Sequence, residues 1–269
     1  MHMTIATHPR SGLSPTHYRL STRLVRHLRS AGIPLEARAL AESVLASRQV
    51  PGGAWVEELL EPLLDGRFER VGGELGLWEW RYPFPASGEA IVVLDVETTG
   101  LSTADHEIIE LAFIRLEAGG QQVFQRMVNP GASIPPFIRR LTGICDADVR
   151  QAPDIYTVLQ EAWPLLEGAT LIIQNAAFDL GFLKPRLLRL GHRLDNPVVD
   201  TLHWARKALP GLPKRGLDAL AWAFDLPAQG RHRALADVET TLAVASEMYY
   251  MLTAGRPVPV TQAAFLSNV

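Results

Sequence analysis

The stretch Ile91–Leu101 constrains the fold of this chain more than any other, because four apolar residues lead directly into an acid, an apolar residue and a second acid. An apolar run of this kind predicts a buried β-strand. Side chains alternate along a strand, so Asp95 and Glu97 lie on one face and Val96 on the other. Two such carboxylates repel each other and resist removal from water, and a bound divalent cation relieves both costs. The alternative is an ordinary strand end with solvated acids before a turn.

The composition is that of a folded protein without disulfides. Apolar residues make up 47% and charged residues 20% of the 269 residues, which suits one or two domains with an ample core. The net charge of −3 means that any contact with nucleic acid depends on local patches. Cys145 is the single cysteine, which excludes an internal disulfide and a zinc site built from cysteines. We expect a cytoplasmic location and no membrane partner, because we find neither a membrane-length apolar run nor a secretory signal.

The N-terminal part of the chain predicts a small α+β domain over residues 15–82, after disorder at residues 1–14. Helical periodicity and a hairpin signal predict three helices, from about Thr16 to the stop at Gly32, at about 35–46 and at about 54–64, and then strands at Phe68–Val71 and Leu77–Trp80. Three short helices followed by a two-stranded ribbon resemble a winged-helix domain.

The charges of this domain leave two roles open. The first predicted helix carries four arginines on the faces away from its leucines: Arg19, Arg23, Arg26 and Arg29. This distribution fits a helix that faces DNA and fits a solvated helix face equally well. The third helix carries Glu57, Glu58 and Glu61, which argue against a uniformly basic surface. The domain therefore either binds DNA or serves packing and protein contacts.

A linker at residues 83–89, marked by prolines and a glycine, precedes a second domain at residues 90–252 and a tail at residues 253–269. Besides the first strand, apolar patterns predict strands at about Ile108–Leu116, Val123–Val128, Thr170–Ile173 and Val198–Val199, with helices between and after them. A long alanine-rich helix at about Leu235–Met251 comes last. This order indicates an α/β domain with a mixed sheet.

Three further polar residues stand out beside the strands and helices of this domain. Asp179 follows the strand Thr170–Ile173 and lies early in the next helix, where the helix dipole favours an acid in any case. Asp237 lies at the start of the last helix and has the same ordinary explanation. His232 precedes that helix in a basic loop, and a lone histidine in a loop is usually a surface residue.

Taken together, these residues follow one order: Asp95-x-Glu97 on a first strand, Phe178-Asp179 on a helix after a later strand, and His232-x-x-x-x-Asp237 before a late helix. This order resembles the DEDDh family of 3′→5′ exonucleases over residues 91–251. The chain is most similar to the proofreading (epsilon) subunit of bacterial DNA polymerase III and its stand-alone relatives, which the segments Asn129-Pro130, Ile134-Pro135 and Leu141–Ile144 also match. Gln174 departs from the histidine of many relatives, and we expect this to change only hydrogen bonding around the site.

The resemblance implies a ribonuclease-H-like fold, a mixed five-stranded sheet flanked by helices, preceded by the winged-helix-like domain. It also implies a catalytic set of Asp95, Glu97, Asp179, His232 and Asp237. The four acids would hold two Mg²⁺ or Mn²⁺ ions, since carboxylates favour these hard cations over zinc. His232 would be the general base for the attacking water, because the ordinary pKa of an imidazole, about 6.5, suits that task.

The resemblance assigns the 3′-terminal nucleotide to a pocket lined by Thr98, Thr99, Gly100, Leu101 and Thr142, and so implies single-stranded DNA or frayed 3′ ends as substrates. Arg231 and Arg233 either contact phosphates or keep the loop soluble. Two alternatives remain: trimming of RNA 3′ ends by the same residues, and a non-catalytic scaffold for a polymerase. Gln262–Leu266 loosely resembles a sliding-clamp-binding peptide, so a polymerase or clamp is a further possible partner, whereas the other reading of the tail is disorder.

Overall fold

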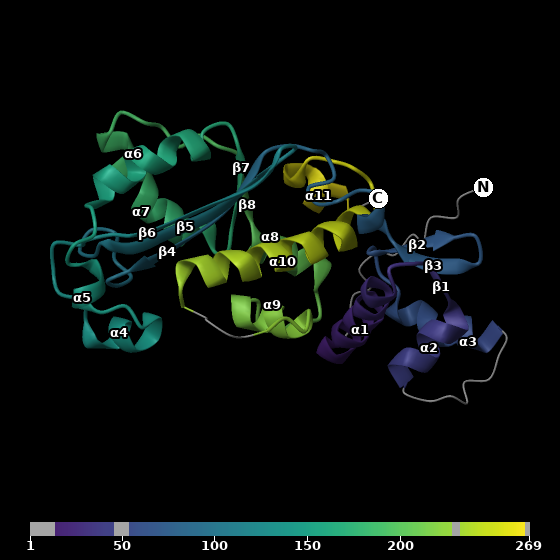
Figure 1. Cartoon of the computed structure of the whole chain (residues 1–269). Coiled ribbons are helices and arrows are strands. Elements are labelled where there is room, and N and C mark those ends of the chain that lie inside the picture. The colour runs from purple at the N-terminus through teal and green to yellow at the C-terminus, as the bar shows by residue number, and fades with distance from the viewer. Residues whose placement is uncertain (1–13, 46–53, 228–231, 267–269) are drawn as a thin grey trace. The chain divides into compact units, whose positions relative to one another are not determined.

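The computed structural model describes residues 14–45, 54–227 and 232–266, and the chain divides into two compact units (Figure 1). Unit 1 contains Met1–Ser87, His203–Pro227 and Val244–Val269, and unit 2 contains Gly88–Leu202 and Ala228–Ala243. The disorder predicted at residues 1–14 lies outside the described residues except for Ser14, as do Arg231 and the side chain of Glu57. Among the described residues, no helix is long and apolar enough to cross a membrane.

Unit 2 is built on a mixed five-stranded sheet with the strand order β6-β5-β4-β7-β8. Its strands are β4 (Ile91–Thr98), β5 (Ile108–Glu117), β6 (Gly120–Met127), β7 (Thr170–Ile173) and β8 (Val198–Asp200). The helices are α4 (Pro136–Thr142), α5 (Asp146–Val149), α6 (Ile155–Leu166), α7 (Ala176–Arg189) and the N-terminal half of α10 (Ala234–Thr253). The ribonuclease-H-like fold and the mixed five-stranded sheet predicted from the sequence are confirmed.

β4 lies at the centre of this sheet and carries the first acidic motif. It pairs with β5 in antiparallel fashion on one side and with β7 in parallel on the other. The register places Asp95 opposite Ala112 and Glu97 opposite Glu110, and a bulge follows between Glu97 and Thr98. Since the bulge interrupts the ladder, the backbone leaves the sheet immediately after the two acids.

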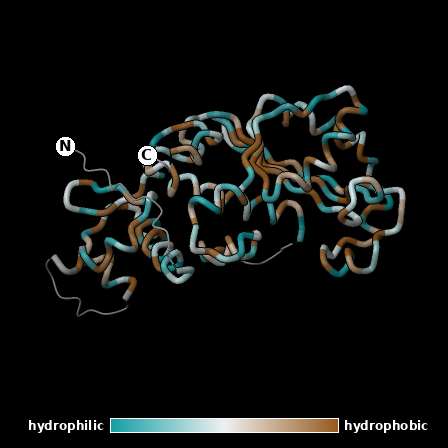
Figure 2. The backbone as a smooth tube through the Cα atoms, turned by 180° about the vertical axis from the view of Figure 1, so that it is seen from behind, coloured by the Kyte–Doolittle hydropathy of each residue, from teal (hydrophilic) through white to brown (hydrophobic). Residues whose placement is uncertain are grey.

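The core of unit 2 explains why these strands form. Val92, Leu94 and Val96 of β4 are buried together with the apolar residues of β5, β7, α6 and α7. Figure 2 shows hydrophobic residues concentrated along the strands of this sheet. Because Val96 is buried on the core side, the alternation of the strand turns Asp95 and Glu97 to the other face, where both are largely but not fully buried.

Unit 1 begins with three helices and a small antiparallel sheet of order β1-β3-β2. Its elements are α1 (Pro15–Ala31), β1 (Leu35–Glu36), α2 (Ala37–Leu45), α3 (Ala54–Leu60), η1 (Glu61–Leu63), β2 (Phe68–Val71), β3 (Glu74–Leu77) and η2 (Trp78–Trp80). Leu24, Leu28 and Phe68 are among the residues of its own buried core.

Two features of unit 1 differ from the predicted elements. The second hairpin strand runs over Glu74–Leu77 rather than Leu77–Trp80, so that prediction was wrong. Gly76 lowers the strand propensity there, and the ring of Trp80 packs closely where a β-carbon of residue 76 would point. The third helix ends at Leu60 and continues only as the short 3₁₀ turn η1.

Unit 1 also contains helices from the second half of the chain. They are α8 (Thr201–Ala208, from His203 onward), α9 (Leu217–Ala223), the C-terminal half of α10 and α11 (Val260–Leu266). α11 lies in the segment described above as a tail and was not predicted. Val260 and Ala263 are fully buried, and Lys207 donates a hydrogen bond to the carbonyl of Ala264. Tertiary contacts of this kind stabilise a seven-residue helix that would be marginal alone.

Candidate active site

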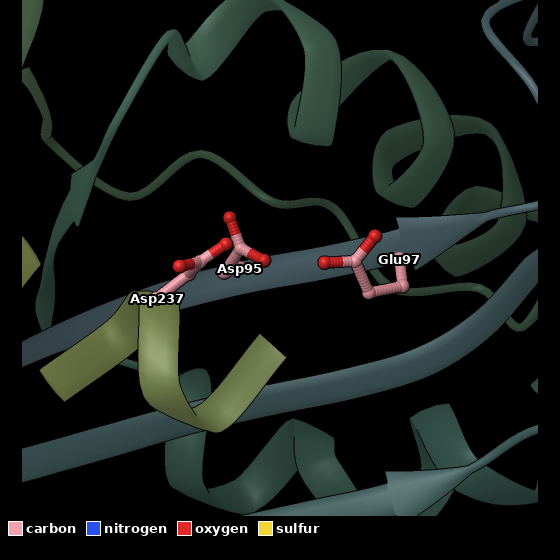
Figure 3. Close-up of side chains that lie close together, drawn as sticks. All are labelled: Asp95, Glu97 and Asp237. Atoms are coloured by element: carbon pink, nitrogen blue, oxygen red, sulfur yellow. The ribbon is translucent and has the colours of Figure 1, made fainter. Parts of the chain in front are cut away.

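The structure brings together three of the predicted carboxylates. Asp95 and Glu97 come from β4 and Asp237 from the first turn of α10, and one ligand oxygen from each lies within 4.8 Å of the others. Figure 3 shows the carboxyl groups of Asp95 and Asp237 side by side, with Glu97 further along the strand. Residues separated by 140 positions in the chain therefore present oxygens to one small volume, which is the arrangement of a divalent cation site.

Asp179 approaches the same strand from a different element. It lies in the first turn of α7, is buried, and accepts a hydrogen bond from the backbone N–H of Val96 at 3.1 Å. This bond fixes its carboxylate against the residue between Asp95 and Glu97. Asp179 stands outside the group of three carboxylates, but its charge acts on Asp95.

Burial and mutual repulsion make these acids hold their protons. Burial, and then the charges of Asp179, Glu97 and Asp237, raise the pKa of Asp95 well above its usual range. Burial, followed by the charges of Asp237 and Glu110, raises the pKa of Glu97 to about 8. Burial also raises the pKa of Asp179 to about 8, against the hydrogen bond from Val96 that lowers it. A divalent cation would replace these protons and relieve the repulsion.

The donor set indicates which cations fit. All of the gathered ligand atoms are carboxylate oxygens, and no cysteine or histidine belongs to the group found among the described residues. Hard cations such as Mg²⁺ and Mn²⁺ prefer oxygen ligands, whereas zinc sites in proteins usually include sulfur or nitrogen. Asp95, Glu97 and Asp237 therefore suit a hard divalent cation.

His232 lies at the start of the segment that leads into α10. Its backbone N–H donates to Oδ2 of Asp237 at 3.2 Å. Its φ of 63° is in the left-handed region, which few non-glycine residues adopt, although histidine and asparagine do so more readily than most. Asn175, immediately before α7, has a φ of 61°. A residue with a left-handed backbone conformation thus lies shortly before each of the two helices, α7 and α10, that carry a site acid.

The residues predicted to hold the terminal nucleotide fall into two groups. The hydroxyls of Thr98, Thr99 and Thr142 are buried and bond to nearby backbone. The hydroxyls of Thr98 and Thr142 donate to backbone carbonyls, whereas that of Thr99 accepts from the N–H of Glu107, so all three help to shape the local chain. Leu101, by contrast, is 83% exposed. A β-carbon at Gly100 would overlap the ring of His106, so any larger residue there would force that ring to move.

Reasoning from the sequence missed two acids that organise the site. Glu110 is fully buried on β5 and binds Arg233 and the N–H of Ala234. Asp200, the last residue of β8, accepts hydrogen bonds from the N–H groups of Asn175 and Ala176 at the start of α7. Each of the two could have been singled out from the sequence. Glu110 is a lone acid within a continuous apolar run, and Asp200 stands between a predicted strand and a predicted helix.

One region of the chain matches a known protein family, and it contains all five predicted catalytic residues. The model of the exonuclease family (RNase_T) matches residues 92–245, which is more than half of the chain.

Two curated relatives match a similar region. The protein DNA polymerase III PolC-type of Caldanaerobacter subterraneus subsp. tengcongensis is 37% identical over 158 residues, or 58% of this chain and 11% of that protein. A DNA polymerase III subunit epsilon-like protein of Rhodobacter capsulatus is 38% identical over 176 residues, or 63% of this chain and 24% of that protein. The matched part is therefore a small portion of each of these longer proteins.

Two solved structures share the fold. Exonuclease X in complex with 5′ overhanging duplex DNA has a TM-score of 0.52 at 23% identity, over 66% of this chain and 99% of that one. E. coli exonuclease I in complex with a dA16 oligonucleotide has a TM-score of 0.53 at 21% identity, over 63% of this chain and 42% of that one. At these identities the likeness is one of fold.

Proposed function

The chain belongs to the exonuclease family, and we propose that it is a metal-dependent enzyme that removes nucleotides from the 3′ end of DNA. The observation that supports this most directly is the meeting of Asp95, Glu97 and Asp237 within 4.8 Å. A scaffold without catalysis gains nothing from acids that repel one another in a buried place, because such a cluster costs folding free energy. The cluster therefore favours an enzyme over a scaffold.

Asp95, Glu97 and Asp237 would hold one Mg²⁺ or Mn²⁺ ion, and Asp95 together with Asp179 would hold a second, directly or through water. Two such ions, when bound, stabilise the charge that develops on the phosphate and favour hydroxide near neutral pH. The hydrogen bond from Val96 keeps Asp179 against β4, so the start of α7 is fixed to the strand that carries Asp95 and Glu97.

His232 would accept the proton of the attacking water. The water oxygen forms a bond to the last phosphorus, the bond to the 3′ oxygen of the preceding nucleotide breaks, and that oxygen takes up a proton. The products are a nucleoside 5′-monophosphate and a strand one nucleotide shorter with a free 3′ hydroxyl. The hydrogen bond from the backbone N–H of His232 to Asp237 links the proposed base to a proposed metal-binding residue.

Leu101 supports a preference for unpaired 3′ ends. Its side chain projects into solvent from the loop that follows Glu97, as expected of a residue that packs against a terminal base. An unpaired base separates from its neighbours at low cost, whereas a paired base must first be unstacked. A single strand or a mismatched end would thus enter the site more readily than a matched duplex, which suits proofreading or repair.

We propose that the N-terminal elements form a winged-helix-like domain whose role is packing rather than DNA contact. The order α1-β1-α2-α3-β2-β3 and the sheet order β1-β3-β2 support this description. Three of the four α1 arginines already have acidic partners within unit 1: Arg19 and Arg26 pair with Asp225, and Arg29 pairs with Glu79 and Glu247.

The predicted clamp-binding segment is part of a packed helix rather than a free tail. Gln262–Leu266 lies within α11, where Ala263 and Ala264 are buried and only Gln262 and Phe265 are exposed. We therefore leave a sliding clamp out of the proposed function.

The proposal is tested by a time course on 5′-labelled single-stranded DNA, matched RNA and duplex with a 3′ mismatch, each with Mg²⁺, Mn²⁺ or a chelator. We expect a metal-dependent ladder that shortens from the 3′ end of DNA, faster on the mismatched than on the matched duplex. Cleavage of RNA alone would replace the DNA proposal with RNA trimming. Absence of cleavage with every metal would support the scaffold instead.

A further inference from the structure

We propose that Glu110 and Arg233 are positioning residues that attach the chain before α10 to strand β5 and thereby hold His232 against the acids of β4. The inference rests on the proposed function of the site and adds two residues to it. Neither is among the residues that the family resemblance assigned to catalysis.

Glu110 lies close to the acids yet does not act as one of the metal-binding residues. It is opposite Glu97 in the β4–β5 register, so both side chains are on the same face of the sheet. Its two oxygens are fully engaged: one accepts from Gln125 Nε2 at 2.7 Å and Arg233 Nη2 at 3.1 Å, the other from Arg233 Nε at 3.1 Å and Ala234 N–H at 3.0 Å. Four donors saturate a carboxylate, so none of its oxygens remains for a cation.

The same contacts show what Glu110 does. Two of its donors come from Arg233 and a third from Ala234, which are the two residues directly after His232. A paired, bidentate contact to a fully buried carboxylate fixes orientation as well as position. The start of α10 is therefore attached to the central sheet at the point where the chain turns into the helix.

The backbone of His232 explains why such an attachment is needed. A non-glycine residue in the left-handed region persists only where its surroundings enforce that conformation. On one side, the His232 N–H binds Asp237. On the other, Arg233 and Ala234 are held by Glu110. Without the latter contact, His232 would be restrained only by its own short segment.

The hydrogen bonds of Arg233 also bear on whether it positions the chain or contacts a phosphate. Nε and Nη2 face Glu110, so this edge of the guanidinium positions the chain, and only the Nη1 side is left for a phosphate contact. Loss of a phosphate contact raises KM, whereas loss of a positioning contact lowers kcat.

The test compares Arg233→Ala and Glu110→Gln with the wild type, alone and combined with His232→Ala, on single-stranded DNA with Mn²⁺. Arg126→Ala is the control, because Arg126 is about as exposed as Arg233 and lies in the same unit, but its partner Glu161 is exposed. We expect each positioning variant to lower kcat by about 10- to 100-fold with little change in KM, and to add almost nothing once His232 is alanine. Equal losses in both backgrounds, or a raised KM with normal kcat, would overturn the inference.

A second measurement does not depend on activity. Amide hydrogen exchange of peptides covering residues 232–237 should be faster in Arg233→Ala and Glu110→Gln than in the wild type, and unchanged in Arg126→Ala. Unchanged exchange in the first two variants would show that the pair does not hold the segment. An inactive wild type would reject the proposed function, and the exchange data would still decide this inference. Use of two variants guards against one that fails to fold.

Discussion

The two units each bury a cluster of charged side chains, and the clusters are built on opposite principles. In unit 1, Arg67 is 3% exposed and its guanidinium donates to Asp65, Glu247, Ser21 and Thr22. Arg29 binds the other oxygen of Glu247. In unit 2, Asp95, Glu97 and Asp237 face one another.

The difference shows how to tell a structural cluster of charges from a functional one. Buried charges that serve the fold are paired and hydrogen-bonded, because unpaired ones cost several kcal/mol. The acids of unit 2 break this rule, and their raised pKa values express the cost. Glu110 is the instructive exception within unit 2, since it is buried beside the acids but fully paired. The gathering of mutually repelling acids in unit 2 therefore supports the proposed cation site.

The largest effect should come from Asp95→Ala. Loss of this residue removes the carboxylate at the centre of the cluster, and we expect exonuclease activity to fall by about four orders of magnitude or more. The melting temperature without metal should stay the same or rise, because one member of a repulsive group is gone. Activity and calorimetry on the same preparation measure both. Wild-type activity of Asp95→Ala, with contaminating nucleases excluded, would show that the site assignment is wrong, and Asp195→Ala, an exposed acid, serves as control.

Arg67→Ala should have the opposite result: a large loss of stability without a change in the chemistry of the folded protein. It leaves Asp65 and one oxygen of Glu247 buried without their cation. We expect a loss of roughly 3–5 kcal/mol in the free energy of unfolding, measured by urea denaturation. Arg38→Ala breaks the exposed pair with Glu42 and should cost only about 0.3–0.5 kcal/mol. Similar losses in the two variants would mean that the network of unit 1 adds little to stability.

Much of the fold and of the candidate site in unit 2 can be predicted, because the sequence patterns that indicate them are local. The apolar run before Asp95 and the alternation after it fix β4 and the face of its acids, and the ordered motifs of the family point to Asp179, His232 and Asp237. What sequence reasoning missed depends on the tertiary fold. Nothing near Glu110 shows that Arg233, 123 positions later, will bind it.

The arginines of α1 teach the same lesson in unit 1. Counted along the sequence, Arg19, Arg26 and Arg29 form a basic helix that suggests DNA contact. In the structure their partners are Asp225, Glu79 and Glu247, which lie far away in the sequence. The charges of a helix can be counted from its own sequence, but the acidic partners that neutralise them come from distant parts of the chain. A basic helix alone therefore does not establish a nucleic-acid interface.

His232→Ala tests the role of the imidazole separately from that of the acids. We expect cleavage to slow by about two orders of magnitude, because a positioned base typically contributes this much or more. Mn²⁺ binding, measured by isothermal titration calorimetry, should be nearly unchanged, since the acids remain. The control is His203→Ala, at an exposed histidine of α8. Loss of Mn²⁺ binding along with activity would mean that His232 helps to hold the metal.

The smallest effect is a dependence of stability on pH that metal should reverse. Glu97 and Asp179 have ordinary pKa values of 4.5 and 3.8 and folded values of about 8. Between about pH 4 and pH 8 the folded chain thus keeps protons that the unfolded chain has released, so their contribution to stability is full below this window and lost as the pH rises through it. Without metal, the melting temperature should fall across the window, more in the wild type than in Glu97→Gln.

If Mn²⁺ binds these carboxylates as proposed, it takes the place of those protons, so the rise in melting temperature on adding Mn²⁺ should be larger near pH 8 than near pH 6. Differential scanning calorimetry at both pH values, with Mn²⁺ or a chelator, measures it. The paired charges of unit 1 offer no such site, so Arg38→Ala should respond to Mn²⁺ as the wild type does and Glu97→Gln should respond less. A rise that is the same at both pH values would mean that protons and metal do not compete for these carboxylates, and the contrast between the two clusters would then not mark a cation site.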